Sequence, residues 1–162
     1  METITHNGQI ISIIYRDSDW IKGLNFITPD ELFVQVGSWW YDKGKKLDSH
    51  IHKDFDRKAT RTQETIYIKQ GSVRVLIFTE EEEFLQDYIL HQGDLAVFGY
   101  GGHGYEILKD DTQVIESKNG PFISVDKDKK KFKDYIMKLH LGCWNRIIPG
   151  FVNIDLCDME HI

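Results

Sequence analysis

Short apolar and β-branched runs, separated by turn-forming residues, dominate the chain as far as Gly120. Residues 64–72 alternate between apolar and polar side chains, and residues 73–78 are rich in valine and isoleucine, so a hairpin turning at Gly71 is expected. Two more hairpins are predicted on the same grounds, 84–91 with 94–98 and 104–108 with 113–118. Many short strands with almost no helical periodicity favour an antiparallel sandwich or a small barrel.

The segments around these hairpins are less regular. Residues 10–15 are β-branched and predict a first strand, whereas residues 20–26 predict a helical turn. A further strand is expected over 31–41, with a break at Gly37. The acidic run 80–83 is interpreted as the solvated tip of a hairpin rather than as an acidic site.

Candidate chemistry is concentrated in the histidines. On an extended strand the side chains of His50 and His52 point to the same face, so their imidazoles can share one metal ion. The carboxylate of Glu64 and the imidazole of His103 would complete a mixed nitrogen and oxygen site for a first-row divalent metal. Without Glu64, the three histidines would still leave open positions for water or substrate. Solvated histidines that bind no metal are the alternative interpretation.

The spacing of these residues resembles the two motifs of the cupin family. The first motif is matched by Gly44, His50, His52, Glu64 and Gly71, with a longer gap before Glu64, and the second by residues 93–103. The resemblance implies an all-β, cupin-type antiparallel β-barrel (a double-stranded β-helix or jelly roll) over residues 1–126. It also implies a metal, namely Mn, Fe, Ni or Zn, with four ligands: His50, His52, Glu64 and His103.

Cationic and aromatic side chains near this expected site are candidates for ligand binding. Arg57 and Arg61 carry planar guanidinium groups that match carboxylates and phosphates. Trp39, Tyr41 and Tyr100 would line a pocket, or would belong to the core. A small anionic ligand is therefore expected, with a solvated loop as the alternative role of the two arginines.

The last part of the chain has a different character. Residues 127–136 are highly charged and predict a linker, which leaves residues 137–162 as a short C-terminal extension. In this extension Gly142 and Asp155 follow two apolar runs, and this pattern resembles the opening of a class I S-adenosylmethionine-dependent methyltransferase domain. Trp144 stands where a loop glycine is expected, and the chain ends before the remaining elements of a doubly wound sheet. This chain is therefore not expected to bind S-adenosylmethionine by itself.

Composition narrows the classes of function. A chain of 162 residues suffices for one ordinary domain, and a net charge of −6 disfavours general binding to nucleic acid or to anionic membranes. The two cysteines are expected to be reduced thiols in a cytoplasmic protein. No signal peptide or membrane span is expected. Apolar residues within 137–157 should be covered by the barrel or by a partner chain. Together with the cupin resemblance, which implies pairing of barrels, this predicts a homodimer.

Three functional hypotheses follow. The first is a metal-binding cupin that binds or transforms a small, anionic, sugar-like ligand, with isomerase, oxygenase and hydrolase activities not distinguished. The Thr-Gln-Glu segment at 62–64 is similar to that of small cupins linked to surface-polysaccharide metabolism, which motivates the sugar. The second is a non-catalytic binding or dimerisation module from a cupin–methyltransferase fusion. The third is a structural barrel without a metal.

Overall fold

The computed structural model describes residues 1–54, 56, 58–120, 124, 128–132, 139–141 and 152–154. The chain divides into two compact units, Met1–Lys130 and Lys131–Ile162. Within the described residues, no helix is long and apolar enough to cross a membrane.

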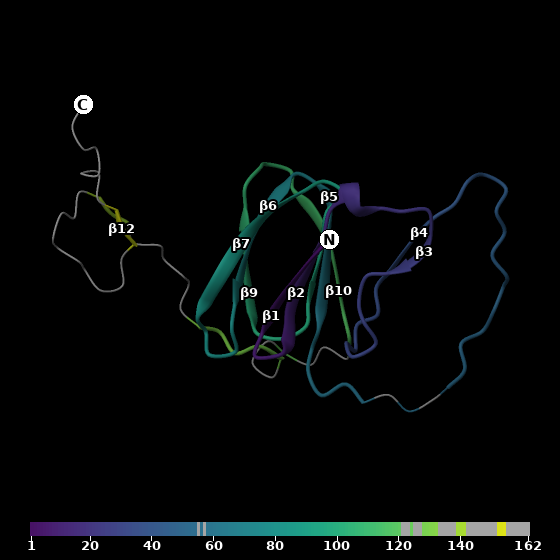
Figure 1. The fold of residues 1–162 in the computed structure, drawn as a ribbon, viewed down its shortest axis with the longest axis horizontal. Helices are drawn as coiled ribbons and strands as arrows, with labels where there is room; N and C mark the ends of the chain where they lie inside the picture. Colours follow the sequence, from purple (N-terminus) through teal and green to yellow (C-terminus); the bar gives the residue numbers. More distant parts are fainter. Residues whose placement is uncertain are drawn as a thin grey trace. The chain divides into compact units, whose positions relative to one another are not determined.

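The first unit is all-β and antiparallel, as predicted, and its largest sheet has five strands in the order β1-β2-β8-β5-β10 (Figure 1). These strands are β1 (Glu2–His6), β2 (Gln9–Tyr15), β8 (Leu95–Phe98), β5 (Glu64–Gln70) and β10 (Gln113–Lys118). A second sheet has the order β7-β6-β9, with β7 (Phe84–His91), β6 (Ser72–Phe78) and β9 (Gly102–Ile107). Every neighbouring pair in both sheets is antiparallel.

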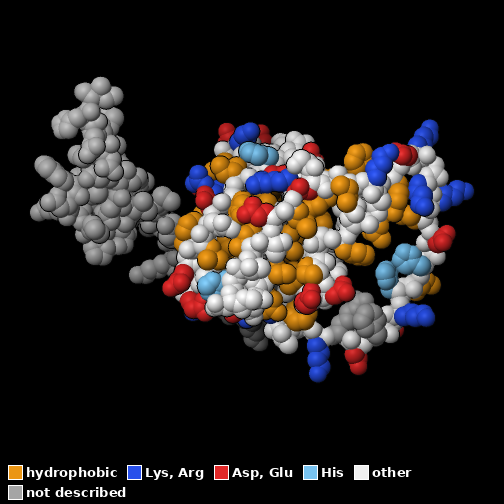
Figure 2. Space-filling model, in the orientation of Figure 1, with side chains coloured by type: hydrophobic (Ala, Val, Ile, Leu, Met, Phe, Trp, Pro, Cys, Tyr) orange, Lys and Arg blue, Asp and Glu red, His pale blue; other side chains and the backbone are white. Residues whose placement is uncertain are grey.

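A separate two-stranded hairpin pairs β3 (Gly23–Phe26) with β4 (Gly37–Trp40). A short 3-10 helix, η1 (Asp17–Asp19), lies between β2 and β3. Figure 2 shows hydrophobic side chains at the surface over this hairpin. Two predictions for this region are wrong. Residues 20–26 contain the strand β3 rather than a helical turn, and the strand expected over 31–41 is shortened to β4. Pro29 and the polar residues after it disfavour a longer strand.

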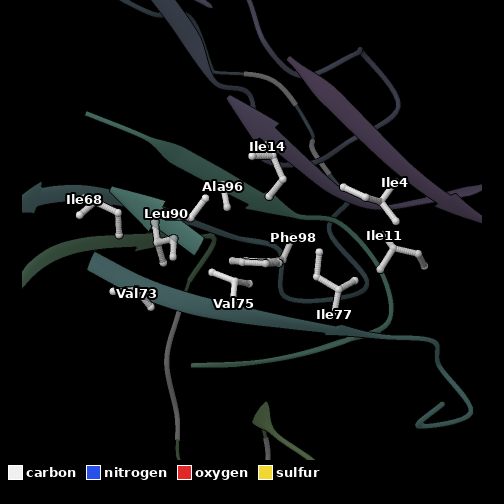
Figure 3. Packing of buried hydrophobic residues seen from close by; sticks show 11 residues of the cluster. Ile4, Ile11, Ile14, Ile68, Val73, Val75, Ile77, Leu90, Ala96 and Phe98 are labelled. Carbon is white, nitrogen blue, oxygen red and sulfur yellow. The ribbon is translucent and has the colours of Figure 1, made fainter. Parts of the chain in front are cut away.

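The main core lies between the five-stranded and three-stranded sheets (Figure 3). Ile66 and Ile68 of β5 face Val75 and Ile77 of β6, and all four side chains are buried. Burial of each such side chain contributes about 1.5–3 kcal/mol. A second cluster packs on the outer face of the five-stranded sheet and consists of Ile13, Tyr15, Ile27, Leu32 and Val97.

The predicted hairpins in the second half of the unit are wrong in their pairing, although their strands lie where expected. β5 and β6 follow one another in sequence but belong to different sheets, and the same is true of β7 with β8 and of β9 with β10. At Gly71 the backbone has a φ of 84°, and a Cβ atom there would lie 2.2 Å from the Thr112 hydroxyl oxygen. The close approach of Thr112 makes this turn a corner between sheets rather than a hairpin turn.

One predicted turn is confirmed. The acidic residues 80–83 are mostly exposed and lie at the tip that joins β6 to β7. The backbone N–H of Thr79 donates to the carbonyl of Glu83 at 2.8 Å, which closes this tip.

The second unit contains β11 (Leu139–Leu141) and β12 (Val152–Ile154), which pair in parallel with Leu139 opposite Val152. These strands coincide with the two apolar runs that resemble a methyltransferase opening. Gly142 and Asp155 lie outside the described residues, as do position 127 and positions 133–136 of the predicted linker.

Candidate functional site

A buried carboxylate, that of Glu64, lies between the two large sheets. Glu64 opens β5, and its side chain points to the same side as Ile66 and Ile68 because side chains alternate along a strand. It is only 3% exposed. A buried charge is costly unless it is paired, so the groups around Glu64 decide the chemistry of this position.

The partners of Glu64 come from β9, in the other sheet. The hydroxyl of Tyr105 donates a hydrogen bond to Glu64 Oε1 at 2.7 Å. The Nε2 atom of His103 lies 3.5 Å from the same oxygen. His103 and Tyr105 are two positions apart on one strand and therefore reach the carboxylate from the same face. These contacts connect β5 with β9 across the core.

The ring of Phe98, the last residue of β8, contacts both partners of Glu64. Its ring stacks on the imidazole of His103 with centroids 4.2 Å apart and an interplanar angle of 24°. Tyr105 meets Phe98 edge to face, with centroids 5.9 Å apart. The two contacts hold both partners of Glu64 in place, so the cluster is preorganised.

The electrostatics keep Glu64 ionised. Burial raises the pKa of this carboxyl group, but the hydrogen bonds from His103 and Tyr105, with the charges of His103 and Lys129, outweigh burial and lower the pKa to about 2. Burial, followed by the charge of Glu64, raises the pKa of Tyr105 far above its usual range, so its hydroxyl group remains protonated. The cluster therefore presents a carboxylate anion at neutral pH.

A second group of charges lies next to Glu64 on the edge strand. Lys118 stands opposite Glu64 in the pairing of β10 with β5. Its Nζ atom lies 3.2 Å from Glu116 Oε1 and 3.7 Å from Asp128 Oδ2. The hydroxyl of Thr62 donates to Asp128 Oδ1 at 2.6 Å. The hydrogen bond to Glu116 raises the pKa of Lys118, which keeps a cation beside the buried carboxylate.

The predicted strand that carries His50 and His52 is not formed. Both residues are exposed, and the described part of segment 41–63 contains no strand. Seven Lys and Arg residues and four Asp residues in this segment, with few β-branched positions, disfavour a strand. The two imidazoles nevertheless contact each other, with ring centroids 5.0 Å apart, and His50 Nδ1 lies 3.1 Å from the carbonyl oxygen of Asp48.

The four predicted metal ligands are therefore arranged as two pairs, Glu64 with His103 and His50 with His52. Among the described residues, no group of three or more His, Cys, Asp or Glu side chains is arranged to hold a metal ion. A site that unites all four residues remains a prediction.

The predicted ligand-binding residues also separate into two groups. The guanidinium of Arg61 lies over the ring of Tyr100, 4.9 Å from its centroid, and pairs with Glu80. Trp39 and Tyr41 neighbour each other on the β3–β4 hairpin, with centroids 6.3 Å apart. Arg57 lies outside the described residues.

Tyr105 is the functional residue that sequence reasoning missed. It is 41% exposed overall, yet its hydroxyl group bonds to the buried carboxylate. Its position two residues after His103 is the signal that identifies it, because both side chains must project from one face of a strand.

The cluster offers three kinds of polar atom to a bound group: a carboxylate oxygen, an imidazole nitrogen and a phenol. Such a set can bind a cation, orient a polar ligand or move a proton. No family model, curated protein or solved structure matches this chain. Its function therefore has to be argued from this geometry.

Proposed function

We propose that this chain is a cupin-like protein that binds a divalent transition metal at Glu64 and His103 and a small anionic ligand beside it. The observation that carries the proposal is the 3.5 Å separation of Glu64 Oε1 from His103 Nε2. Sequence motifs indicated both residues as metal ligands, and the fold brings them together from different sheets.

The donor geometry fits a metal ion. Two donor atoms bound at about 2.1 Å to one tetrahedral ion lie about 3.4 Å apart. The separation of the Glu64 and His103 donor atoms is close to this value, and a carboxylate with an imidazole is a donor set that suits Mn, Fe, Ni or Zn. Tyr105 supports this role because hydrogen bonds to ligating carboxylates orient them toward the metal.

His50 and His52 are the proposed remaining ligands. Their imidazoles already lie together, so they would bind as a pair when segment 41–63 approaches the cluster. When bound, the metal would supply Lewis acidity to a carbonyl or a phosphoryl oxygen of the ligand.

The arrangement of strands supports the cupin-like fold. Successive strands from β5 to β10 lie in two facing sheets with repeated changes of sheet at the corners, which is the pattern of a jelly roll. We infer the closed double-stranded β-helix from this pattern together with the motifs around Gly44 and Gly93.

An anionic, sugar-like ligand is the proposed substrate class. Segment 41–63 has seven basic and four acidic residues, a surplus of three positive charges in a chain of net charge −6. This surplus lies beside the two histidines and attracts anions such as sugar phosphates.

The first test is metal content by mass spectrometry, on untagged protein purified without chelators. We expect wild-type protein to retain or take up about one divalent ion, and His103→Ala to lose it. His50→Ala/His52→Ala should weaken metal binding, because the loop supplies two ligands. His6→Ala/His91→Ala is the matched control, since neither residue lies in the cluster, and it should bind as wild type does.

Failure to bind Mn, Fe, Ni or Zn in the wild type would contradict the metal proposal. Equal metal content in the wild type and in His103→Ala would place the metal elsewhere. Thermal unfolding of each variant without metal shows whether the loss of binding reflects loss of the fold.

A non-catalytic module from a cupin–methyltransferase fusion is the second candidate. The parallel pairing of β11 with β12 favours it, because parallel strands are typical of doubly wound sheets. Calorimetric titration with S-adenosylmethionine tests whether this chain binds the methyltransferase cofactor. No binding is expected from this chain, and micromolar binding would show that the second unit holds the cofactor unaided.

A further inference from the structure

The outer face of the β3–β4 hairpin is apolar and exposed. Leu24 lies directly opposite Trp39, and Phe26 lies opposite Gly37, so these side chains share one face. Leu24, Phe26 and Trp39 are 55%, 68% and 59% exposed. The other face points to the core, because Ser38 is buried and its hydroxyl lies 3.2 Å from that of Tyr15.

The apolar side chains of this face form one contiguous exposed patch. The exposed parts of the two aromatic side chains on this face, Phe26 and Trp39, sum to about 250 Å², given about 150–250 Å² for a whole aromatic side chain. With Leu24 added, this face reaches the range of about 300–600 Å² that is typical of the largest, often functional, apolar patch on a protein surface.

Phe26 also lines a hollow of about 590 Å³. Its wall is mixed, with Ile10 and Pro29 next to Thr3, Asp30 and Glu31. Exposed aromatic side chains therefore lie beside an open depression, and a self-complementary surface needs both a projection and a depression.

Opposite charges mark the two ends of the hairpin. Asp30 and Glu31 are exposed at the end where β3 stops, on the rim of the hollow. Lys43 and Lys46 are exposed beyond the other end, after Trp40 of β4. When two copies of the hairpin meet face to face in antiparallel orientation, the acidic end of each lies against the basic end of the other.

We propose that this hairpin face is the interface of a homodimer with two-fold symmetry. The occupant of the surface is a second copy of this chain, because one surface carries both halves of the charge match and both the aromatic side chains and the hollow that receives them. A two-stranded ribbon is marginally stable alone, so the partner also stabilises the hairpin. The metal site plays no part in this inference.

The apolar part of the interface is tested by sedimentation velocity on the full chain over a range of concentrations. Wild-type protein should be dimeric at micromolar concentration, and Phe26→Ser/Trp39→Ser should raise the dissociation constant at least about 30-fold, as expected for central aromatic residues. Ile107→Ser/Ile115→Ser is the matched control, since both residues are similarly exposed but lie on β9 and β10. It should leave the dissociation constant unchanged.

The charge match is tested by reversal and rescue at low salt. Asp30→Lys/Glu31→Lys and Lys43→Glu/Lys46→Glu should each weaken the dimer, and the combined variant should regain the wild-type dissociation constant. Circular dichroism confirms that each variant is folded. A monomeric wild type, a dimer that Phe26→Ser/Trp39→Ser leaves intact, or a combined variant weaker than both reversals would overturn the proposal.

Discussion

The hydroxyl of Tyr105 donates a hydrogen bond to the carboxylate of Glu64 and thereby ties the edge strand of one sheet to an inner strand of the other. The bond is 2.7 Å long and ends on an ionised, buried group. Hydrogen bonds to charged acceptors contribute more than neutral ones, so this contact should matter to stability and to the site alike.

Removing this hydroxyl should destabilise the protein. Tyr105→Phe keeps the ring against Phe98 but deprives Glu64 of a donor, and we expect a loss of about 2 kcal/mol in the free energy of unfolding. Urea denaturation of the metal-free protein measures it. Tyr67→Phe, on the opposite face of β5, is the control and should cost less than about 0.5 kcal/mol. Equal losses in the two variants would show that the bond to Glu64 is unimportant.

Tyr105→Phe should also weaken metal binding. Loss of an outer hydrogen bond to a ligating residue typically reduces metal affinity by about 10–100-fold. Titration of the metal-free variant with Zn²⁺ measures the change, and the Tyr67→Phe control should bind as wild type does. Unchanged affinity in Tyr105→Phe would separate this hydroxyl from the metal site.

Acid should unfold the metal-free protein partly through Glu64. Its pKa is about 2 in the folded protein against 4.5 ordinarily, so folding favours the ionised form. The resulting stability, at most about 3 kcal/mol, is fully present above pH 4.5 and is lost as the pH falls toward 2. Glu64→Gln should lack this dependence. Unfolding free energies of both proteins between pH 2 and 6 test the prediction, and parallel curves would refute it.

Asp94 should be a second determinant of stability. Its carboxylate accepts hydrogen bonds from the Arg16 side chain and from the backbone N–H groups of Asp17 and His91. Asp94→Asn replaces one of the accepting carboxylate oxygens with an NH₂ group, which can only donate. We expect the free energy of unfolding, measured by chemical denaturation, to fall by about 3 kcal/mol. Asp87→Asn, which breaks the exposed pair with Arg74, should cost about 0.5 kcal/mol or less.

Gly101 should be intolerant of a side chain. Its φ is 69°, and a Cβ atom there would lie 2.3 Å from the carbonyl oxygen of Phe78. Gly101→Ala should therefore cost more than about 2 kcal/mol and disturb the nearby His103. Gly44→Ala is the control because Gly44 also has a positive φ, 94°, but open space around it. A thermal unfolding temperature equal in both variants would contradict the role of this contact.

Much of the local structure could be predicted from the sequence. The alternation in 64–70 and the valine and isoleucine run in 72–78 place β5 and β6 where they occur. The inward direction of Glu64 follows from the period-two pattern shared with Ile66 and Ile68. Sheet membership could not be predicted, because a glycine turn suits a hairpin and a corner equally, and the contact that decides between them at Gly71 comes from distant Thr112.

The candidate site could be predicted only in part, because it also depends on contacts between segments that are distant in the sequence. The spacing motifs identified Glu64 and His103, whose proximity depends on the two sheets facing each other. The strand expected at His50 and His52 rested on a motif alone, in a segment whose charged composition gives a strand little to bury. The hairpin face could not be predicted, because the sequence pattern predicts a helical turn at Leu24 and a strand at Trp39, and these two elements would not pair.

The order of strands in the five-stranded sheet also constrains how the protein is made. The hydroxyl of Ser12 on β2 donates to the carbonyl of Val97 on β8, 85 positions further along the chain, and β5 lies between β8 and β10. Contacts of such long range make folding slow. On the ribosome, β2 can pair with β1 but is synthesised long before β8, and β5 is synthesised before both of its partners. The isoleucine side chains of β5 therefore remain without their neighbouring strands until β8 has been made, and the sheet is complete only after Lys118, which exposes a strand prone to aggregation during translation.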